Sequence, residues 1–328
     1  MSGPNYAELI DQETWAYIAK LDAAYPPDAV TLTVAQQRDL YDTMCRIFHR
    51  PRPARVSVKD VSYGGVACRE YSASETAVTV IYYHGGGFVV GSLDSHDNVC
   101  AEICDLTGYR VISVAYALAP EVVFPGCFND AWAACAAICS QHNGRVILCG
   151  DSAGGNLAAA IAHHSRAHLG DTRIAGQVLI YPGLGGDMTK GSYVRHAHAP
   201  QLTLADLEFY QRVRFGGRDI PRDDPRCAPL RDSDFARLPP TVVITAECDP
   251  LSSDGESYRD ALLRAGGKAV WIEVAGMVHA CLRARHSARR AAAFFGHVVD
   301  GIAALGKGAW PYGENQVLNK STRERLRP

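Results

Sequence analysis

The sequence has 328 residues, 47% of them apolar, which is enough to bury one large α/β core or two smaller ones. Its 33 basic and 35 acidic residues leave a formal charge of −2 at pH 7, so composition gives no electrostatic reason to expect nucleic acid or an anionic membrane as a partner. No run of about 18 apolar residues occurs, and the first residues lack a basic segment followed by an apolar one. We therefore expect a cytoplasmic protein.

Eleven cysteines, mostly in apolar segments, predict buried thiols in a reducing compartment. Cys100 and Cys104 are spaced one helical turn apart, as are Cys135 and Cys139, and either pair could chelate a metal. Neither belongs to the doubled Cys-x2-Cys pattern of a zinc site. Packing is the favoured interpretation, and we expect no metal site.

Taken in chain order, residues 1–50 are expected to be helical, and β-rich segments then alternate with helix-like ones from about residue 55. The candidate strands are Arg55–Tyr63, Val66–Tyr71, Val78–Tyr83, Arg110–Tyr116, Arg145–Cys149, Gln177–Tyr181, Thr241–Ala246 and Lys268–Val274. Most are apolar on both faces, which is typical of a parallel sheet covered by helices on both sides. Only Gly64-Gly65 separates the first two strands, which predicts an antiparallel hairpin at the sheet edge.

Residues 184–235 lie between two predicted strands but are too long for a simple crossover. Within them, Thr203-Leu-Ala-Asp206 has the spacing of a capping box and predicts the start of a helix. We expect this insertion and the N-terminal segment to form a cap over the sheet, although both could simply cover core. The predicted division is a cap segment at 1–50, a catalytic domain in two parts at 51–183 and 236–305, a cap insertion at 184–235, and a tail at 306–328.

The apolar run from Arg145 leads into Gly150-Asp-Ser-Ala-Gly154, a Gly-x-Ser-x-Gly motif centred on Ser152. At a sharp turn from strand to helix, such a serine is held in a strained conformation with its hydroxyl above the sheet edge. The motif has glycine at positions 150 and 154 because a side chain at either position would crowd the strand and helix backbones. Because the motif also occurs by chance, its partners decide the interpretation.

A second glycine cluster follows the strand Val78–Tyr83, in the segment His84-Gly-Gly-Gly-Phe-Val-Val-Gly91. Glycines at the carboxyl end of a strand leave backbone N–H groups free to bind a ligand oxygen. We predict an oxyanion hole formed by the N–H groups of Gly85, Gly86 and Ala153. We interpret His84 as a residue that shapes the loop. The glycine spacing does not match a dinucleotide site, and no cofactor is expected.

A serine nucleophile needs a base and a group that orients the base. Asp249 and His279 each follow a later predicted strand, so both are expected at the sheet edge that carries Ser152. The competing candidates are Glu247 and Asp254 as acids and His286 and His297 as bases. The latter two belong to an Arg- and Ala-rich C-terminal helix, where a solvated face is the ordinary explanation.

Five motifs occur in order: His84-Gly-Gly-Gly-Phe, Tyr116-Ala-Leu-Ala-Pro-Glu121, Gly150-Asp-Ser-Ala-Gly-Gly155, Asp249-Pro-Leu251 and Gly276-Met-Val-His279. Together they resemble the hormone-sensitive lipase family of carboxylesterases, especially its bacterial acetyl-esterase-like members. The resemblance implies an α/β-hydrolase fold with a mostly parallel sheet flanked by helices, a helical cap, a preference for short acyl chains and often a homodimer. Carried over by position, it assigns a triad of Ser152, Asp249 and His279 and an oxyanion hole of Gly85, Gly86 and Ala153.

Two departures from the family pattern are visible. Ala117 stands where the family usually has arginine, and Ala280-Cys281 where it often has Gly-Phe. Neither change removes a predicted catalytic group. The predicted function is hydrolysis of small-molecule short-chain acyl esters through an acyl-enzyme intermediate. The alternatives are amidase, lactonase or arylesterase activity with the same triad, or a non-catalytic binding protein on the same fold.

Overall fold

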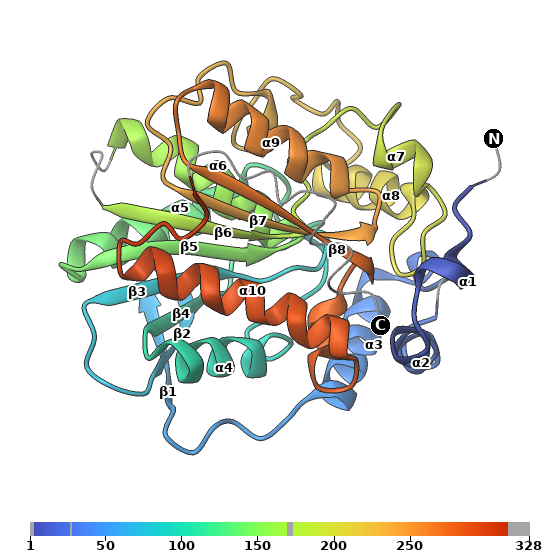
Figure 1. Cartoon of the computed structure of the whole chain (residues 1–328), viewed down its shortest axis with the longest axis horizontal. Helices are drawn as coiled ribbons and strands as arrows, with labels where there is room; N and C mark the ends of the chain where they lie inside the picture. The colour runs from blue at the N-terminus through green and yellow to red at the C-terminus, as the bar shows by residue number, and fades with distance from the viewer. Residues whose placement is uncertain (1–2, 27, 169–172, 314–328) are drawn as a thin grey trace.

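The structure is a computed structural model that describes residues 3–26, 28–168 and 173–313. A single eight-stranded sheet, in the order β1-β2-β4-β3-β5-β6-β7-β8, runs through the middle of the molecule between two layers of helices (Figure 1). The strands are β1 (Ser57–Tyr63), β2 (Val66–Ser72), β3 (Val78–Tyr83), β4 (Arg110–Val114), β5 (Arg145–Asp151), β6 (Ile174–Ile180), β7 (Thr241–Cys248) and β8 (Ala269–Val278). All eight predicted strands are present, and the predicted fold class is confirmed.

The pairing of the strands is parallel from β4 to β8, and β2 is antiparallel to both of its neighbours, β1 and β4. Gly64 and Gly65 connect β1 to β2 with φ angles of 59° and 82°. A two-residue turn with both φ angles positive matches the right-handed twist of the strands, and glycine adopts it without steric cost. The predicted edge hairpin is confirmed.

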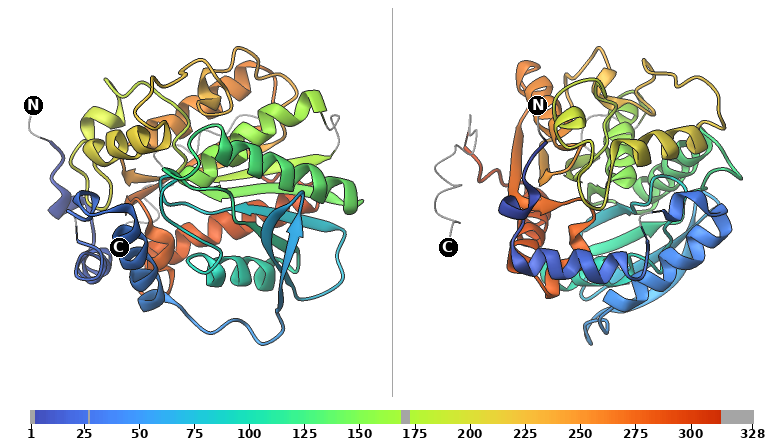
Figure 2. Two further views of the ribbon diagram at one scale, coloured as in Figure 1. Left: turned by 180° about the vertical axis from the view of Figure 1, so that it is seen from behind. Right: turned by 90° about the vertical axis from the view of Figure 1, so that its right-hand side faces the viewer.

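The helices cover both faces of the sheet. They are α1 (Tyr6–Leu9), α2 (Gln12–Asp22), α3 (Val34–Phe48), α4 (Asp97–Thr107), α5 (Gly126–Gln141), α6 (Ala153–His168), α7 (Ser192–Arg195), α8 (Leu204–Arg214), α9 (Ser252–Arg264) and α10 (Arg289–Gly306), with short 3-10 turns η1 (Ala29–Thr31), η2 (Pro229–Arg231) and η3 (Cys281–His286). Helices α4 and α10 pack on one face, and α5, α6 and α9 on the other (Figures 1 and 2).

The core is divided in two by the sheet, as the alternation along a strand requires. In β3, Val80 and Tyr82 belong to the core cluster on the α4 and α10 side, whereas Ile81 and Tyr83 belong to the cluster under α5 and α6. All four are fully buried. Successive side chains of a strand point to opposite faces, so a strand covered on both sides has to be apolar at every position.

The three strands whose ends carry the candidate site run further than predicted. β5 continues to Asp151, β7 to Cys248, and β8 continues past Gly276 to Val278. The predicted strand ends at Val274, just before Ala275-Gly276. The chain instead passes through Gly276 in a left-handed conformation, φ 67°, at an irregularity in the register, and pairs with β7 again at Val278, which faces Cys248. Glycine is the residue that permits this without steric strain.

Helices α1, α2 and α3, together with α7 and α8 of the segment 184–235, lie at the same end of the molecule, beyond the carboxyl ends of the parallel strands (Figure 2). Helix α8 begins with the predicted capping box, in which Asp206 N–H donates to Thr203 Oγ1 at 3.1 Å and Thr203 N–H donates to Asp206 Oδ2 at 2.8 Å. The two segments also contact each other, since Gln201 Nε2 donates to Asp22 Oδ1 at 2.8 Å.

Beyond α10, Trp310 and Tyr312 pack against the core, while residues 314–328 of the predicted tail lie outside the described residues. All eleven cysteines fall within the described ranges, and each is buried and unpaired. Among the described residues, no group of three or more histidine, cysteine or acidic side chains is arranged to hold a metal. None of the helices described is both long and apolar enough to cross a bilayer.

Candidate active site

Ser152 lies at the turn between β5 and α6, with φ at 55°. Its N–H donates to Ile180 O of the neighbouring strand at 2.9 Å, which anchors the turn to the sheet. A Cβ atom on Gly154 would collide with Tyr83 O, and one on Gly150 would lie 2.7 Å from the same oxygen. The motif therefore needs glycine on both sides because the start of α6 crosses directly over β3 and β5, as predicted.

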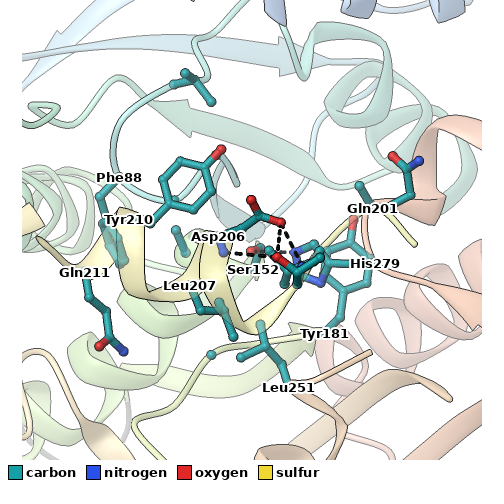
Figure 3. A pocket seen from close by; sticks show the side chains of 18 of the residues that line it. Phe88, Ser152, Tyr181, Gln201, Asp206, Leu207, Tyr210, Gln211, Leu251 and His279 are labelled. Carbon is teal, nitrogen blue, oxygen red and sulfur yellow. Dashed lines mark hydrogen bonds between the residues drawn. The ribbon is translucent and has the colours of Figure 1, made fainter. Parts of the chain in front are cut away.

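The structure brings Ser152, His279 and Asp249 together from the ends of β5, β8 and β7. His279 Nε2 lies 2.8 Å from Ser152 Oγ (Figure 3), and His279 Nδ1 lies 2.7 Å from Asp249 Oδ2. Asp249 is fully buried, and its second oxygen accepts the Leu251 N–H at 2.8 Å. The His279 ring rests against Tyr181, with 4.6 Å between ring centres. Both nitrogens of the imidazole are thus held in defined directions.

The competing acids and bases lie elsewhere. Glu247 accepts the Gly276 N–H at 2.8 Å, and Asp254 accepts the Leu184 N–H at 2.7 Å, so both carboxylates support loops. His286 pairs with Glu102 at 2.9 Å. His297 belongs to α10, on one face of the sheet. The structure therefore does not place these four side chains beside Ser152.

Gly85 does not lie where the sequence predicts. Its N–H donates to Asp151 Oδ1 at 2.9 Å, and Gly85 is absent from the pocket wall, whereas Gly86 and Gly87 are part of it. The prediction of Gly85 as an oxyanion donor is wrong, because its only N–H is already bound. Among the residues described, no acceptor is bound to the N–H groups of Gly86, Gly87 or Ala153. Gly87 is the residue that sequence reasoning missed.

Asp151 anchors the glycine-rich loop of residues 84–91 by accepting the Gly85 N–H. Tyr82 donates its hydroxyl to Asp151 Oδ1 at 2.8 Å, and His96 Nε2 lies 3.4 Å from Oδ2. Burial alone would raise the pKa of Asp151, but the charge and hydrogen bond of His96, together with Tyr82 and Arg283, lower it well below its usual value. The carboxylate is therefore ionised, and it keeps the Gly85 N–H fixed beneath the site.

His84 is a structural residue of the same loop. Its ring stacks on Tyr116 with 4.4 Å between ring centres, and its Nδ1 lies 2.9 Å from Gly85 O. Burial, followed by the charge of His96, lowers the pKa of His84 to about 4, so the ring is neutral at pH 7. No hydrogen bond joins it to Ser152 in the described part of the chain, which agrees with the interpretation made from sequence.

The two departures from the family pattern are accommodated locally. Ala117 N–H donates to Asp130 Oδ2 at 2.9 Å. Ala280 has a left-handed backbone, φ 60°, and its carbonyl accepts the Tyr17 hydroxyl of α2 at 2.8 Å. A residue with a Cβ atom is disfavoured in this conformation, so the contact with Tyr17 helps to hold the segment that follows His279.

A cavity of about 580 Å³ opens onto Ser152 and His279. Its walls come from the sheet end, from α2 and α3, and from the 184–235 segment, with Phe88, Gln201, Asp206, Leu207, Tyr210, Gln211 and Leu251 among the side chains drawn in Figure 3. A cavity of this size suits a small organic molecule. The arrangement offers a serine hydroxyl, a base oriented by a buried carboxylate, and free peptide N–H groups in the wall of one pocket.

Comparison with known proteins agrees with this geometry. Residues 80–283 match the family model described as the alpha/beta hydrolase fold. The chain is 32% identical over 283 residues to Ethyl acetate hydrolase of Pseudomonas putida, covering 83% of this chain and 81% of that protein. It is 33% identical over 239 residues to Carboxylesterase NlhH of Mycobacterium tuberculosis, covering 69% and 75% of the two chains.

Solved structures of esterases are also similar to this chain over most of its length. The hyperthermophilic esterase of Pyrobaculum calidifontis superposes with a TM-score of 0.80 at 30% identity and covers 90% of this chain and 99% of its own. The carboxylesterase EstE1, cloned from a metagenomic library, superposes with a TM-score of 0.78 at 31% identity and covers 86% and 99%. By fold, motifs and relatives, this chain belongs to the α/β-hydrolase fold family and, within it, to the hormone-sensitive lipase group of carboxylesterases.

Proposed function

We propose that this protein is a serine carboxylesterase in which Ser152 is the nucleophile, His279 the general base and Asp249 the residue that orients it. One observation carries the proposal: the imidazole lies between the serine oxygen at 2.8 Å and the buried carboxylate at 2.7 Å. A carboxylate at Nδ1 keeps the ring proton there, which leaves the lone pair of Nε2 facing the hydroxyl.

The reaction follows in two acyl transfers. Ser152 Oγ attacks the ester carbonyl while its proton moves to His279 Nε2, and the carbonyl oxygen becomes an oxyanion. The N–H groups of Gly86, Gly87 and Ala153 stabilise this charge, aided by the positive end of α6. The C–O bond to the alcohol then breaks, and the His279 proton passes to the leaving oxygen. Water repeats the sequence on the acyl-enzyme and releases the acid.

The proposed substrates are esters with short acyl chains. The cavity of about 580 Å³ has to accommodate the acyl and alcohol parts together, and apolar side chains such as Leu207 and Leu251 line its walls. A relative named Ethyl acetate hydrolase points in the same direction. We also propose that residues 1–50 and 184–235 act as a cap, since both segments contribute walls to this cavity.

The test uses p-nitrophenyl esters from acetate to palmitate with the wild type and the variant Ser152→Ala. We expect the highest kcat/KM at the short end and a loss of more than 99% of turnover in the variant. Ser140→Ala, in the exposed part of α5, is the matched control and should keep wild-type activity. Residual turnover above about 1% in Ser152→Ala would place the nucleophile elsewhere. Flat or long-chain activity would contradict the short-acyl assignment.

We further propose a cytoplasmic location and a homodimer, acting on a small-molecule ester without nucleic acid, membrane or cofactor. The eleven buried, unpaired thiols support a reducing compartment. The dimer rests on the family resemblance. Cell fractionation and sedimentation velocity test these two points separately.

A further inference from the structure

Arg214, the last residue of α8, is a buried cation in the wall of the active-site cavity. Only 6% of the residue is exposed. Its guanidinium carbon lies 3.6 Å from the centre of the Phe88 ring and 5.3 Å from that of Phe215. Nη2 donates to Asn156 Oδ1 at 3.2 Å, and Nε is buried without a hydrogen-bond partner. A guanidinium carries five N–H donors, so its hydrogen-bonding capacity is largely unused.

No carboxylate neutralises this charge. Among the described residues, Arg214 forms no ion pair within 4.0 Å. Asp224 interacts with it through space but forms its own ion pair with Arg226 at 2.7 Å. The thiol of Cys127 is also close; burial raises the pKa of this thiol, and Arg214 lowers it only in part, so the sulfur stays protonated. Buried charges are normally paired, and this one has no ion-pair partner among the residues that the structure describes.

The other buried or half-buried charged side chains of the cavity wall form hydrogen bonds with polar groups. Arg283 contacts the Tyr41 hydroxyl and interacts with the ionised Asp151. Asp206 accepts two hydrogen bonds from Thr203 in the capping box. Arg283 likewise forms no ion pair within 4.0 Å among the described residues, and its Nε also lacks a hydrogen-bond partner, but Arg283 is only half-buried. Arg214 is therefore the arginine of this wall that is both buried and without an ion pair in the described structure.

We propose that Arg214 binds a carboxylate carried by the substrate, so that the preferred esters are anionic. This inference rests on the ester hydrolysis proposed above. The aromatic rings stabilise the cation through their faces without neutralising it, and they leave the N–H groups in the guanidinium plane free. A carboxylate matches this planar fork and accepts two parallel hydrogen bonds. An apolar wall at this point would exclude such a group.

Asn156 positions the guanidinium relative to the reacting carbonyl. It lies four residues after Ser152, which is about one turn along α6. Its Nδ2 donates to Gly183 O at 2.7 Å and to Cys227 O at 2.9 Å, so the amide cannot turn and its Oδ1 faces Arg214. The substrate carboxylate is therefore expected only a few bonds away from the ester carbonyl.

Two matched pairs of esters test the proposal and distinguish which half of the substrate carries the charge. For the acyl half, p-nitrophenyl hydrogen glutarate is compared with p-nitrophenyl pentanoate, after subtraction of spontaneous hydrolysis. For the alcohol half, 4-acetoxybenzoate is compared with 4-methylphenyl acetate. In at least one pair, we expect the wild type to hydrolyse the carboxylate ester with a kcat/KM no lower than that of its neutral partner.

The variant Arg214→Gln should lower this anionic-to-neutral ratio by about ten-fold to a hundred-fold, the range for a lost hydrogen-bonded charge pair. A ratio is used because any general loss of active enzyme cancels within it. Arg212→Gln removes the same charge from an exposed position of α8 and should leave the ratio within two-fold. A ten-fold wild-type preference for the neutral ester in both pairs, or an unchanged ratio in Arg214→Gln, overturns the assignment. Absence of hydrolysis of the neutral esters would instead overturn the proposed function, and this inference with it.

Discussion

Replacing Asp249 with asparagine is expected to abolish activity by reversing the imidazole tautomer. Asp249 Oδ1 accepts the Leu251 N–H at 2.8 Å, and Oδ2 faces His279 Nδ1 at 2.7 Å. In Asp249→Asn, the amide oxygen has to remain with the Leu251 N–H, so the NH2 group turns toward Nδ1. The ring proton then moves to Nε2, which lies 2.8 Å from Ser152 Oγ and can no longer accept the serine proton.

The expected loss is about 10⁴-fold in kcat, the size associated with the wrong tautomer in a Ser-His-Asp arrangement. Steady-state hydrolysis of p-nitrophenyl acetate measures it, and circular dichroism with the thermal midpoint checks that the variant folds. Glu247→Gln is the matched control, because it converts another carboxylate at the end of β7 into an amide that can still accept the Gly276 N–H. It should stay within about three-fold of wild type. Loss of less than ten-fold in Asp249→Asn would refute the role given to Asp249.

Two further predictions concern stability. Burial raises the pKa of Asp254 from 3.8 to about 6, and its Oδ2 accepts hydrogen bonds from Leu184 N–H, Gly186 N–H and the Tyr193 hydroxyl. Because the folded protein holds this proton more tightly than the unfolded chain, Asp254 costs about 3 kcal/mol of stability as the pH rises from about 4 to above 6. Asp254→Asn keeps an oxygen acceptor without the charge, so it should be more stable relative to wild type at pH 7.5 than at pH 4 in urea unfolding; a difference independent of pH would contradict the raised pKa. Gly296 lies inside α10 with open space where a Cβ would be, so Gly296→Ala should increase the free energy of unfolding by about 0.5–1 kcal/mol, and a decrease would show that the space is occupied.

The fold and the turn at Ser152 could be predicted because the information is local. Apolar strands of a few residues, the Gly64-Gly65 turn and the glycines on both sides of Ser152 each constrain backbone geometry within a short stretch of chain. The predicted ends of the strands are less accurate. For example, β8 continues past Gly276 because it pairs with β7 again at Val278. That pairing is made with residues about thirty positions away, and nothing within the segment itself reports it.

The glycine loop that we propose to form the oxyanion hole shows the same limit at a single residue. The run of three glycines identifies the loop, but its spacing cannot tell which N–H groups are free. Gly85 is excluded because Asp151, 66 residues later in the chain, accepts its N–H. This hydrogen bond shifts the available donors to Gly86 and Gly87.

The role proposed for Arg214 rests on tertiary packing, and no sequence pattern predicts it. In the sequence it is a basic residue in the last turn of a helix, where a cation favours the helix dipole and is usually solvated. Folding places it against Phe88 and Asn156, which come from loops and helices far away in the chain, and buries it. Residue order thus specifies which backbone turns can form, because these depend on neighbours along the chain. Which charges lose water and which N–H groups stay free depends on contacts between distant segments, and these exist only once the sheet and cap have packed.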